Sequence, residues 1–374
     1  MARQIRTILT NFSAGELNPL LTARTDAKAY FDGAKQCRNW YLLDEGGVMR
    51  SPGTTYTASF STRETRIVPF IFSNDEVAIF ALSNNRLDVY NSSGTSVQAN
   101  ITSNCNWTTA QLFELNFAQF GDTVIVCHRD NEIRKINRAS ATSFSVSALS
   151  FSTHSSGYPR YQPYYKYEDD AVTLTPAATS GTGVNVTASS AIFDSDANWV
   201  GKTLRIGGKE VDITGRTNTT VVVVTVRETL GGTGANADWD ELLWSSHRGF
   251  PQAVSFHDNR LWFGGNPSKP SSVVASQVGE YFNFDVGSGN ANEAIDVAIA
   301  GDRVNEVRHF VSSRNLQVFT DGGEYYIPTS SDIAAITPSN IAFRRQTPFG
   351  CSRANPVVFD GATVFSQKNG KEIR

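Results

Sequence analysis

The sequence predicts a mainly β protein in which a β-propeller-like repeat of hairpins is interrupted by a small inserted β domain. The first observation is composition: charged residues make up 18% of the chain, which also contains 23 Phe, 12 Tyr and 29 Gly. Aromatic residues favour strands, and Gly, Asn and Ser favour turns. The second is the scarcity of helix-type sequence, since only two Met occur and long stretches rich in Ala, Leu, Glu and Lys are missing. The third is a recurring hairpin.

The hairpin unit has a turn with Asp or Asn, an alternating apolar strand, a second polar turn and another strand. Its five copies cover residues 73–90, 120–136, 256–276, 313–327 and 359–370. Asp-Gly and Asn-Gly suit tight turns because they tolerate positive φ. A single hairpin cannot bury its apolar face, and radial packing into a propeller solves that problem. A β-sandwich with similar hairpins is the alternative, and the uniformity of the unit favours the propeller.

The spacing of the copies gives the domain organisation. More than a hundred residues separate the second copy from the third, and they are rich in Thr, Val and Gly, with a β-branched run at residues 219–226. We expect this segment to form a small β-barrel or sandwich, entered and left through linkers rich in Pro and Gly. The predicted parts are an N-terminal arm (1–66), the first part of the propeller (67–165), the inserted domain (166–247) and the second part of the propeller (248–374).

The N-terminal arm differs in character from the rest. We expect one short helix within residues 23–35 and extended chain from Trp40 onward. The arm carries nine Lys and Arg against six Asp and Glu, whereas the whole chain has a net charge of -3. Its basic residues form a candidate protein interface, because Arg pairs well with carboxylates in bidentate geometry. A solvated surface is the alternative for these residues, which are Arg24, Lys28, Lys35, Arg38 and Arg50.

Composition also argues against several functional classes. Proteins that grip nucleic acid through phosphates carry a basic excess, and this chain does not. The four Cys residues are far apart and form no CxxC pair, so we expect no zinc site. Cys127 is expected to be a buried free thiol. The polar start at residues 1–6 predicts no secretory signal, and apolar runs such as residues 221–224 are far too short for a membrane-spanning helix.

One motif resembles the opening of a calcium loop. Asp194, Asp196 and Asn198 follow the D-x-D-x-N pattern, but Trp199 stands where such loops need Gly and Arg205 where they need Glu. A polar turn is therefore the preferred interpretation, and no metal or cofactor is predicted.

The other candidates for chemistry also have simpler interpretations. His257 and Asp258 occupy a turn of the repeat, Glu168 belongs to an acidic linker, and residues 231–234 (GGTG) precede no helix. No G-x-S-x-G or H-E-x-x-H motif occurs. We predict no catalytic residue and no enzyme.

Two blocks of sequence resemble a known family. The first comprises residues 11–19 (NFSAGELNP), 21–26 (LTARTD), Tyr30, 39–41 (NWY) and 46–54 (GGVMRSPGT). The second comprises residues 248–251 (RGFP), Val254, 256–257 (FH), 259–265 (NRLWFGG) and 279–284 (GEYFNF). Their order and spacing resemble those of the tail nozzle family of short-tailed bacteriophages, also called tail tubular protein B-like or hub proteins.

The resemblance implies a structural protein of the virion tail with a propeller-containing subunit. It implies a hexameric ring around a DNA ejection channel, below the portal and adaptor rings, with fibres, spikes or a needle attached. Viral DNA would pass without sequence-specific binding. The basic arm residues would then contact the adaptor ring or a neighbouring subunit. Family members run past residues 365–374, so either the rest is a separate chain or this relative closes its propeller with fewer blades.

A second hypothesis is a propeller that binds or degrades surface glycans. Trp262, Tyr164 and Tyr165 would be the platforms on which sugars stack. Glu168 or Asp258 would be the acids, since glycoside hydrolysis uses paired carboxylates.

Overall fold

The computed structural model describes residues 8–21, 24–56, 59–60, 63–195, 198–301, 303–328 and 335–374. The chain divides into two compact units, residues 1–58 and 59–374. The boundary between the units, at residue 58, lies eight residues before the predicted end of the N-terminal arm at residue 66. The sequence between these two positions carries no clear strand pattern.

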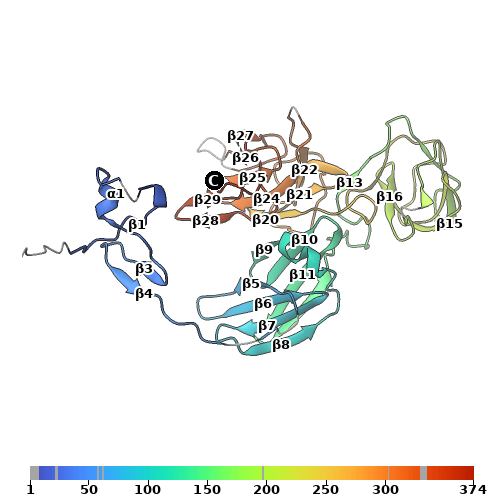
Figure 1. Ribbon diagram of the computed structural model, residues 1–374. Coiled ribbons are helices and arrows are strands. Elements are labelled where there is room, and N and C mark those ends of the chain that lie inside the picture. Colours follow the sequence, from blue (N-terminus) through green and yellow to red (C-terminus); the bar gives the residue numbers. More distant parts are fainter. Residues whose placement is uncertain are drawn as a thin grey trace, which may run out of the picture. The chain divides into compact units, whose positions relative to one another are not determined.

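The second unit contains four antiparallel sheets of four strands each (Figure 1), so the fold is mainly β with a four-blade propeller arrangement. Blade 1 comprises β5 (Arg66–Ile71), β6 (Val77–Ser83), β7 (Arg86–Asn91) and β8 (Ser96–Ile101). Blade 2 comprises β9 (Asn116–Phe120), β10 (Thr123–His128), β11 (Asn131–Ser140) and β12 (Ser143–Ala148). Blade 3 comprises β20 (Ala253–His257), β21 (Arg260–Asn266), β22 (Lys269–Ala275) and β23 (Ile295–Ala298). Blade 4 comprises β24 (Val307–Ser312), β25 (Leu316–Thr320), β26 (Glu324–Ile327) and β27 (Arg344–Thr347).

In the four complete blades, the hairpin repeat corresponds to the second and third strands. Turn residues with positive φ connect strands as their sequence suggests, for example Asn85 (49°) between β6 and β7 and Asp258 (52°) between β20 and β21. These angles are accessible to Asn and Asp at low cost. The first and fourth strands of each blade were not part of the repeat that the sequence displayed.

The fifth hairpin copy is only partly a blade. Strands β28 (Val357–Phe359) and β29 (Ala362–Val364) form a two-stranded sheet. The predicted turn near Lys368 is present, because the backbone groups of Phe365 and Arg374 bond to each other in both directions beyond it. We call β28, β29 and this turn blade 5.

Successive blades pack face to face through apolar clusters. Phe70, Phe80 and Phe144 join blades 1 and 2, where their rings lie 5.2–5.8 Å apart. A second cluster, with Ile125 and Phe263, joins blades 2 and 3, and a third joins blades 3 and 4. Strand β20 contacts both β9 and β24, so the first strands of blades 2, 3 and 4 lie side by side at the centre.

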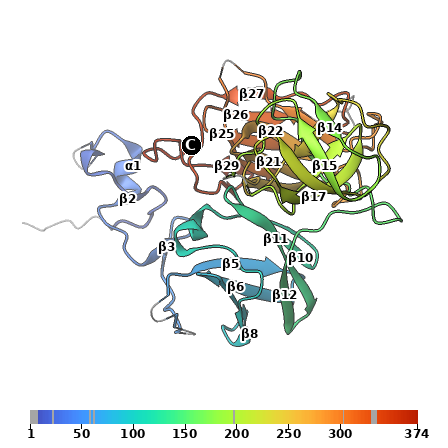
Figure 2. The ribbon, with the colours of Figure 1, turned by 90° about the vertical axis from the view of Figure 1, so that its right-hand side faces the viewer.

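The inserted domain is a seven-stranded sheet that closes into a barrel (Figure 2). Its strands, in spatial order, are β13 (Tyr164–Tyr165), β19 (Trp239–Leu242), β16 (Thr203–Ile206), β17 (Lys209–Arg216), β18 (Val221–Val226), β15 (Gly181–Ala188) and β14 (Leu174–Pro176). The backbones of Leu174 and Asn236 bond in both directions at 2.9 Å, which joins β14 to the segment before β19. Alternating Val, Ile and Leu side chains fill the interior with Phe193 and Trp199.

The elements among the described residues of the first unit, 8–21 and 24–56, are all short. They are β1 (Gly15–Glu16), η1 (Pro19–Leu21), α1 (Lys28–Phe31), β2 (Gly33–Ala34), β3 (Trp40–Leu42) and β4 (Val48–Arg50). The expected helix within residues 23–35 is a single turn, and Asp32 and Gly33 follow it directly. The expected extended chain from Trp40 is the hairpin of β3 and β4. Another 3-10 helix, η2 (Thr109–Glu114), precedes blade 2.

The four Cys residues are all free, and Cys127 is fully buried, as expected from its apolar run. Burial raises the pKa of the Cys127 thiol well above its ordinary value. No helix among the described residues is long and apolar enough to cross a membrane.

Candidate functional site

The five basic residues predicted as an interface all lie in the first unit and all are exposed. Arg24 makes a bidentate ion pair with Asp26, with both hydrogen bonds at 2.8 Å. That pair holds the pKa of the Asp26 carboxyl below its ordinary value. Lys28 begins α1 and Arg50 ends β4, so the charges are spread over several short elements.

The first unit has almost no interior of its own. Among its described residues, 8–21 and 24–56, the buried positions are Gly15, Gly33 and Gly46, and none is an apolar side chain. Large apolar side chains are instead exposed: Ile8, Leu9, Leu20, Phe31, Trp40, Tyr41, Leu42, Leu43, Met49 and Tyr56. Because this described part of the first unit buries no apolar side chain, it gains little stability from the hydrophobic effect. This surface of apolar and basic side chains has the composition of a protein interface.

A central polar network occupies the middle of the propeller. Its side chains are Glu114, Asn116, Arg129, Gln252, Glu306, Arg308, His309 and Arg353. Asn116 begins β9, and its amide Nδ2 donates to the carbonyl oxygens of Gln252 (2.7 Å) and Arg308 (3.2 Å). Gln252 in turn donates to the carbonyl oxygen of Val307 at 2.8 Å. One side chain of blade 2 is therefore bonded to blades 3 and 4 at once.

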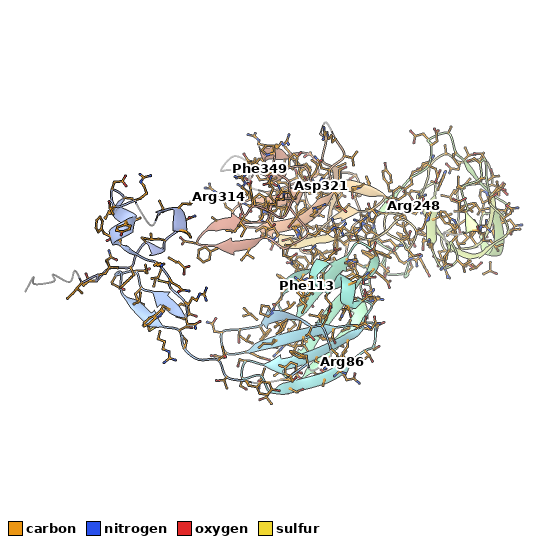
Figure 3. The ribbon with its side chains drawn as sticks, in the orientation of Figure 1. Arg86, Phe113, Arg248, Arg314, Asp321 and Phe349 are labelled. Atoms are coloured by element: carbon orange, nitrogen blue, oxygen red, sulfur yellow. The ribbon has the colours of Figure 1, made fainter. Side chains whose placement is uncertain are left out.

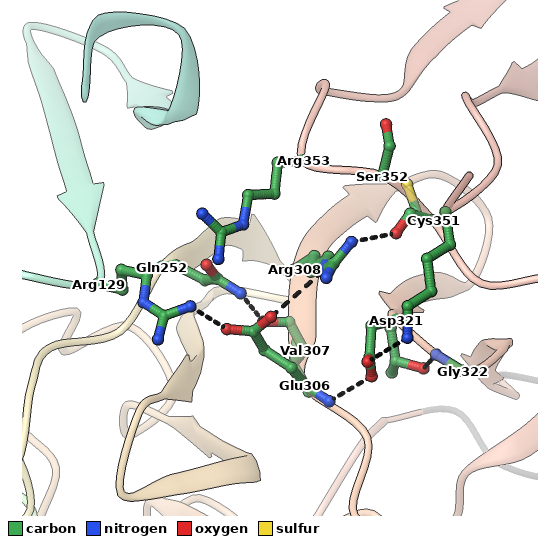
Figure 4. A network of polar contacts seen from close by, with 12 residues as sticks. Arg129, Gln252, Glu306, Val307, Arg308, Asp321, Gly322, Cys351, Ser352 and Arg353 are labelled. Carbon is green, nitrogen blue, oxygen red and sulfur yellow. Dashed lines mark hydrogen bonds and ion pairs between the residues drawn. The ribbon is translucent and has the colours of Figure 1, made fainter. Parts of the chain in front are cut away.

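Carboxylates and guanidinium groups extend the network to one side (Figure 4). Arg129 donates to Glu306 Oε1 at 2.8 Å, and Arg308 lies 3.3 Å from Glu306 Oε2. Arg308 also donates to the carbonyl oxygen of Cys351 at 2.7 Å. Asp321 accepts from the Glu306 backbone N–H at 2.8 Å. The network thus ties the turn after β10, the start of β24 and the segment before β28.

His309 is the buried imidazole of this network. Its Nδ1 lies 2.9 Å from Asn116 Oδ1, and its Nε2 lies 3.1 Å from the carbonyl oxygen of Ser352. Burial lowers the pKa of His309 to about 4, although the Ser352 carbonyl favours the charged form.

An ion pair adds a further link across the centre. Arg353 donates to both carboxylate oxygens of Glu114, at 3.0 and 2.9 Å. The buried His128 lies 3.6 Å from the same carboxylate. The space between six side chains of the central polar network has a cavity volume of about 0 Å³, so they pack closely against one another: Glu114, Asn116, Gln252, Arg308, His309 and Arg353. This arrangement joins blades 2, 3 and 4 through side-chain contacts.

Of the three aromatic residues considered as sugar platforms, Trp262 and Tyr164 are buried, whereas Tyr165 is 37% exposed. Trp262 is 0% exposed, in the core between blades 3 and 4, and its Nε1 donates to the carbonyl oxygen of His257. Tyr164 is buried and donates to Glu210 at 2.6 Å. Lys269 Nζ lies 3.8 Å from the ring centroid of Tyr165. An alternating pattern does not say which face of a strand is covered, which is why the sequence did not exclude them.

The candidate acids lie in different settings. Arg248 lies where the chain passes from the barrel to blade 3 (Figure 3). It donates to Glu168 at 3.1 Å and to the buried Glu241 at 2.6 Å. Asp258 lies in the hairpin turn after β20. The neighbouring His257 lies with its Nδ1 2.9 Å from Ser312 Oγ. Asp258 therefore belongs to a turn, and His257 contacts blade 4.

The calcium-like segment is only partly covered, because Asp196 lies outside the described residues. Trp199, which replaces the expected Gly, is buried against Phe193 with ring centroids 5.1 Å apart. Among the described residues, no group of three His, Cys, Asp or Glu side chains is placed to hold a metal ion. Residues 231–234 form a loop.

One pocket was not anticipated from the sequence. It has a volume of about 420 Å³ and lies beside the linkers to the barrel. Phe151, Trp244 and Phe250 line it, together with the charged side chains of Glu132 and Arg160. These residues are spread over a segment of more than a hundred residues, so no local motif predicts the pocket.

Comparison with known proteins assigns the chain to no family. No protein-family model matches the sequence, and no curated protein matches it. Similar solved structures include the RRP9 WD40 repeats (10% identity, 83% of this chain and 88% of that chain), a streptogramin B lyase (13%, 82% and 94%) and YCF48 from Cyanidioschyzon merolae (12%, 80% and 93%). The TM-score is 0.24 for each of them.

Proposed function

We propose that this chain is a structural subunit of a ring in a short bacteriophage tail, where it forms part of the DNA ejection channel. The observation that carries the proposal is the first unit, whose described residues bury no apolar side chain while ten large ones are exposed. Such a segment gains stability when a protein surface covers it. The basic side chains on it suit a partner with exposed carboxylates, such as an adaptor-ring protein or a neighbouring subunit.

The propeller centre supports the same proposal. In many binding sites a cavity presents a few unpaired polar groups to a ligand. Here the central polar network pairs its side chains with one another and leaves about 0 Å³. Buried polar groups that satisfy one another stabilise a rigid body, which suits a part that must withstand the passage of DNA. The resemblance of the two sequence blocks to tail nozzle proteins supplies the biological setting.

The experiment is an image and a mass of the purified full-length chain. Negative-stain images are expected to show closed rings with an open centre, and light scattering is expected to give an integral multiple of the 40.8 kDa subunit. A variant with Trp40→Ser and Met49→Ser tests the first unit, since it removes apolar area from the β3–β4 hairpin. It is expected to weaken binding to the partner that covers this hairpin without lowering the melting temperature of residues 59–374. A chain that stays monomeric at every concentration overturns the ring.

A glycan-binding role is the second candidate, and the pocket beside Trp244 is the observation that favours it. Its aromatic walls and the nearby Glu132 and Arg160 are the kinds of groups that contact sugars. A glycan array with the wild-type chain and Trp244→Ala separates the two roles. Binding that the substitution abolishes supports the glycan role, whereas no binding to any glycan removes it.

A further inference from the structure

One face of blade 5 is partly covered by blade 4, although Val358, beside Thr363 on that face, is still 56% exposed. Thr363 Oγ1 donates to Gln317 Oε1 of blade 4 at 2.6 Å, and the ring of Phe365 lies 5.2 Å from that of Phe319. Because side chains alternate along a strand, Ala362 and Val364 point away from blade 4. Their cross-strand partners are Phe359 and Val357.

The open face of blade 5 is apolar. Val357 is 62% exposed and Phe359 is 73% exposed. An isolated pair of strands with an uncovered apolar face is marginal in water. We call Val357, Phe359, Ala362 and Val364 the blade-5 face.

Blade 1 has a matching open face at the other end of the blade series. On β5, Val68 and Phe70 point into the cluster shared with blade 2, so Ile67 and Ile71 point the opposite way. They are 59% and 58% exposed. Further out on the same sheet, residues before β5 cover the surface: the ring of Phe60 lies 5.7 Å from that of Tyr90. We call Ile67 and Ile71 the blade-1 face.

Three interfaces within the chain show how such faces are covered. Blades 1 and 2, 2 and 3, and 3 and 4 each pack apolar face to apolar face. If this face-to-face packing of successive blades continued beyond blade 5, the next blade would place a blade-1 face on the blade-5 face. The segments that carry the two faces have net charges of opposite sign, which favours their association. Residues 351–374 hold four basic and two acidic side chains, and residues 63–101 hold three basic and four acidic ones.

We propose that the blade-5 face of one copy packs against the blade-1 face of a second copy of this chain. The contact joins two different surfaces, so it is heterologous and leaves each bound copy with one free face for the next. Repetition of such a contact closes a ring when the rotation per subunit divides a full turn. The inference rests on the proposed ring-forming function and assigns the residues that make the contact.

The test uses one substitution on each face and a matched control. Val357→Asp places a charge on the blade-5 face, and Ile67→Asp places one on the blade-1 face. Val200→Asp, at an exposed Val on the barrel, is the control. Each face variant alone is expected to weaken self-association by about tenfold or more in sedimentation velocity, and the control is expected to assemble as the wild type does.

Mixing the two face variants is the decisive arm of the experiment. Val357→Asp retains a working blade-1 face and Ile67→Asp retains a working blade-5 face, so an equimolar mixture is expected to form a dimer that grows no further. A mixture that remains monomeric overturns the proposal. Phe359→Asp and Ile71→Asp replace either variant whose melting temperature falls, so that a folding defect is not mistaken for a lost contact.

The outcomes also separate this contact from the proposed function. If the wild type forms rings and both face variants form the same rings, the subunits meet elsewhere, so the contact is wrong and the ring stands. If the wild type remains monomeric at every concentration, the contact and the ring are both overturned.

Discussion

Asn116 and His309 lie 193 residues apart in sequence, and their side chains meet at 2.9 Å in the centre of the propeller. Asn116 also donates to carbonyl oxygens of Gln252 and Arg308. A single buried amide therefore connects the first strands of three blades. When such a side chain is removed, its partners remain buried without hydrogen bonds.

Asn116→Ala is expected to lower the free energy of unfolding by about 3 kcal/mol, because three polar partners lose a bond in a site that is closed to bulk water. Chemical denaturation measures the change. Asn290→Ala, at an exposed loop position, is the control and is expected to change stability by less than about 1 kcal/mol. Equal effects of the two substitutions would contradict a structural role for the central polar network.

Stability is expected to fall on acidification. Burial lowers the pKa of His309 to about 4 in the folded chain, against an ordinary value of 6.5. The unfolded chain therefore binds a proton more readily, so stability is fully present above pH 6.5 and is lost as the pH falls toward 4. His309 contributes up to about 3 kcal/mol to this loss. Burial also lowers the pKa values of His128 and His257, which adds in the same direction.

Unfolding by urea at a series of pH values measures this dependence. His309→Gln is expected to have a shallower slope between pH 6.5 and 4 than the wild type, whatever its stability at neutral pH. His154→Gln, in an exposed loop, is the matched control. An unchanged slope for His309→Gln would show that this imidazole takes up its proton without cost.

Gly265→Ala is expected to destabilise the fold by about 3 kcal/mol. Gly265 lies at an irregularity in β21 with φ of +73°, and an added Cβ would collide with the carbonyl oxygen of Val307 on blade 4. Gly231 is the control, because an added Cβ there meets nothing within 4 Å. Thermal unfolding of the two variants should differ by several degrees. Similar melting temperatures would mean that blades 3 and 4 move apart at little cost to make room for the added Cβ.

Glu241→Gln is expected to lower stability by about 2 kcal/mol. The buried Glu241 accepts from Arg248 at 2.6 and 3.1 Å, and the substitution leaves Arg248 with Glu168 as its remaining carboxylate. The loosened linker should also be cut sooner by protease near residue 248. Glu132→Gln, in the exposed pair with Arg134, should change stability by less than about 1 kcal/mol.

Local sequence predicts hairpins well because turn chemistry is local. Asn85, Asp258 and Asp360 all adopt the positive φ that their residue types permit, and each stands in a turn of the predicted repeat. The sequence did not decide between a barrel and a sandwich for the inserted domain. The barrel closes through one bridge between Leu174 and Asn236, and no alternating pattern encodes such a bridge.

The outer and inner strands of the blades were harder to predict for identifiable reasons. Strand β24 contains Arg308 and His309, which interrupt its apolar alternation, yet both side chains are needed inside the central polar network. Strand β5 contains Pro69, which lowers its strand propensity. Polar residues that bond across 100 residues or more of sequence look, in a linear reading, like ordinary surface residues.

The two passages of chain that enter and leave the barrel run beside each other. Tyr164 pairs with Leu242, and the Leu243 backbone N–H donates to the Pro163 carbonyl oxygen at 3.0 Å. Blades 2 and 3 meanwhile contact each other directly. The barrel is therefore joined to the propeller at one place, where Tyr167 and Glu241 bond to Asn266 and Arg248. A substitution on the far surface of the barrel therefore leaves the contact between blades 2 and 3 intact.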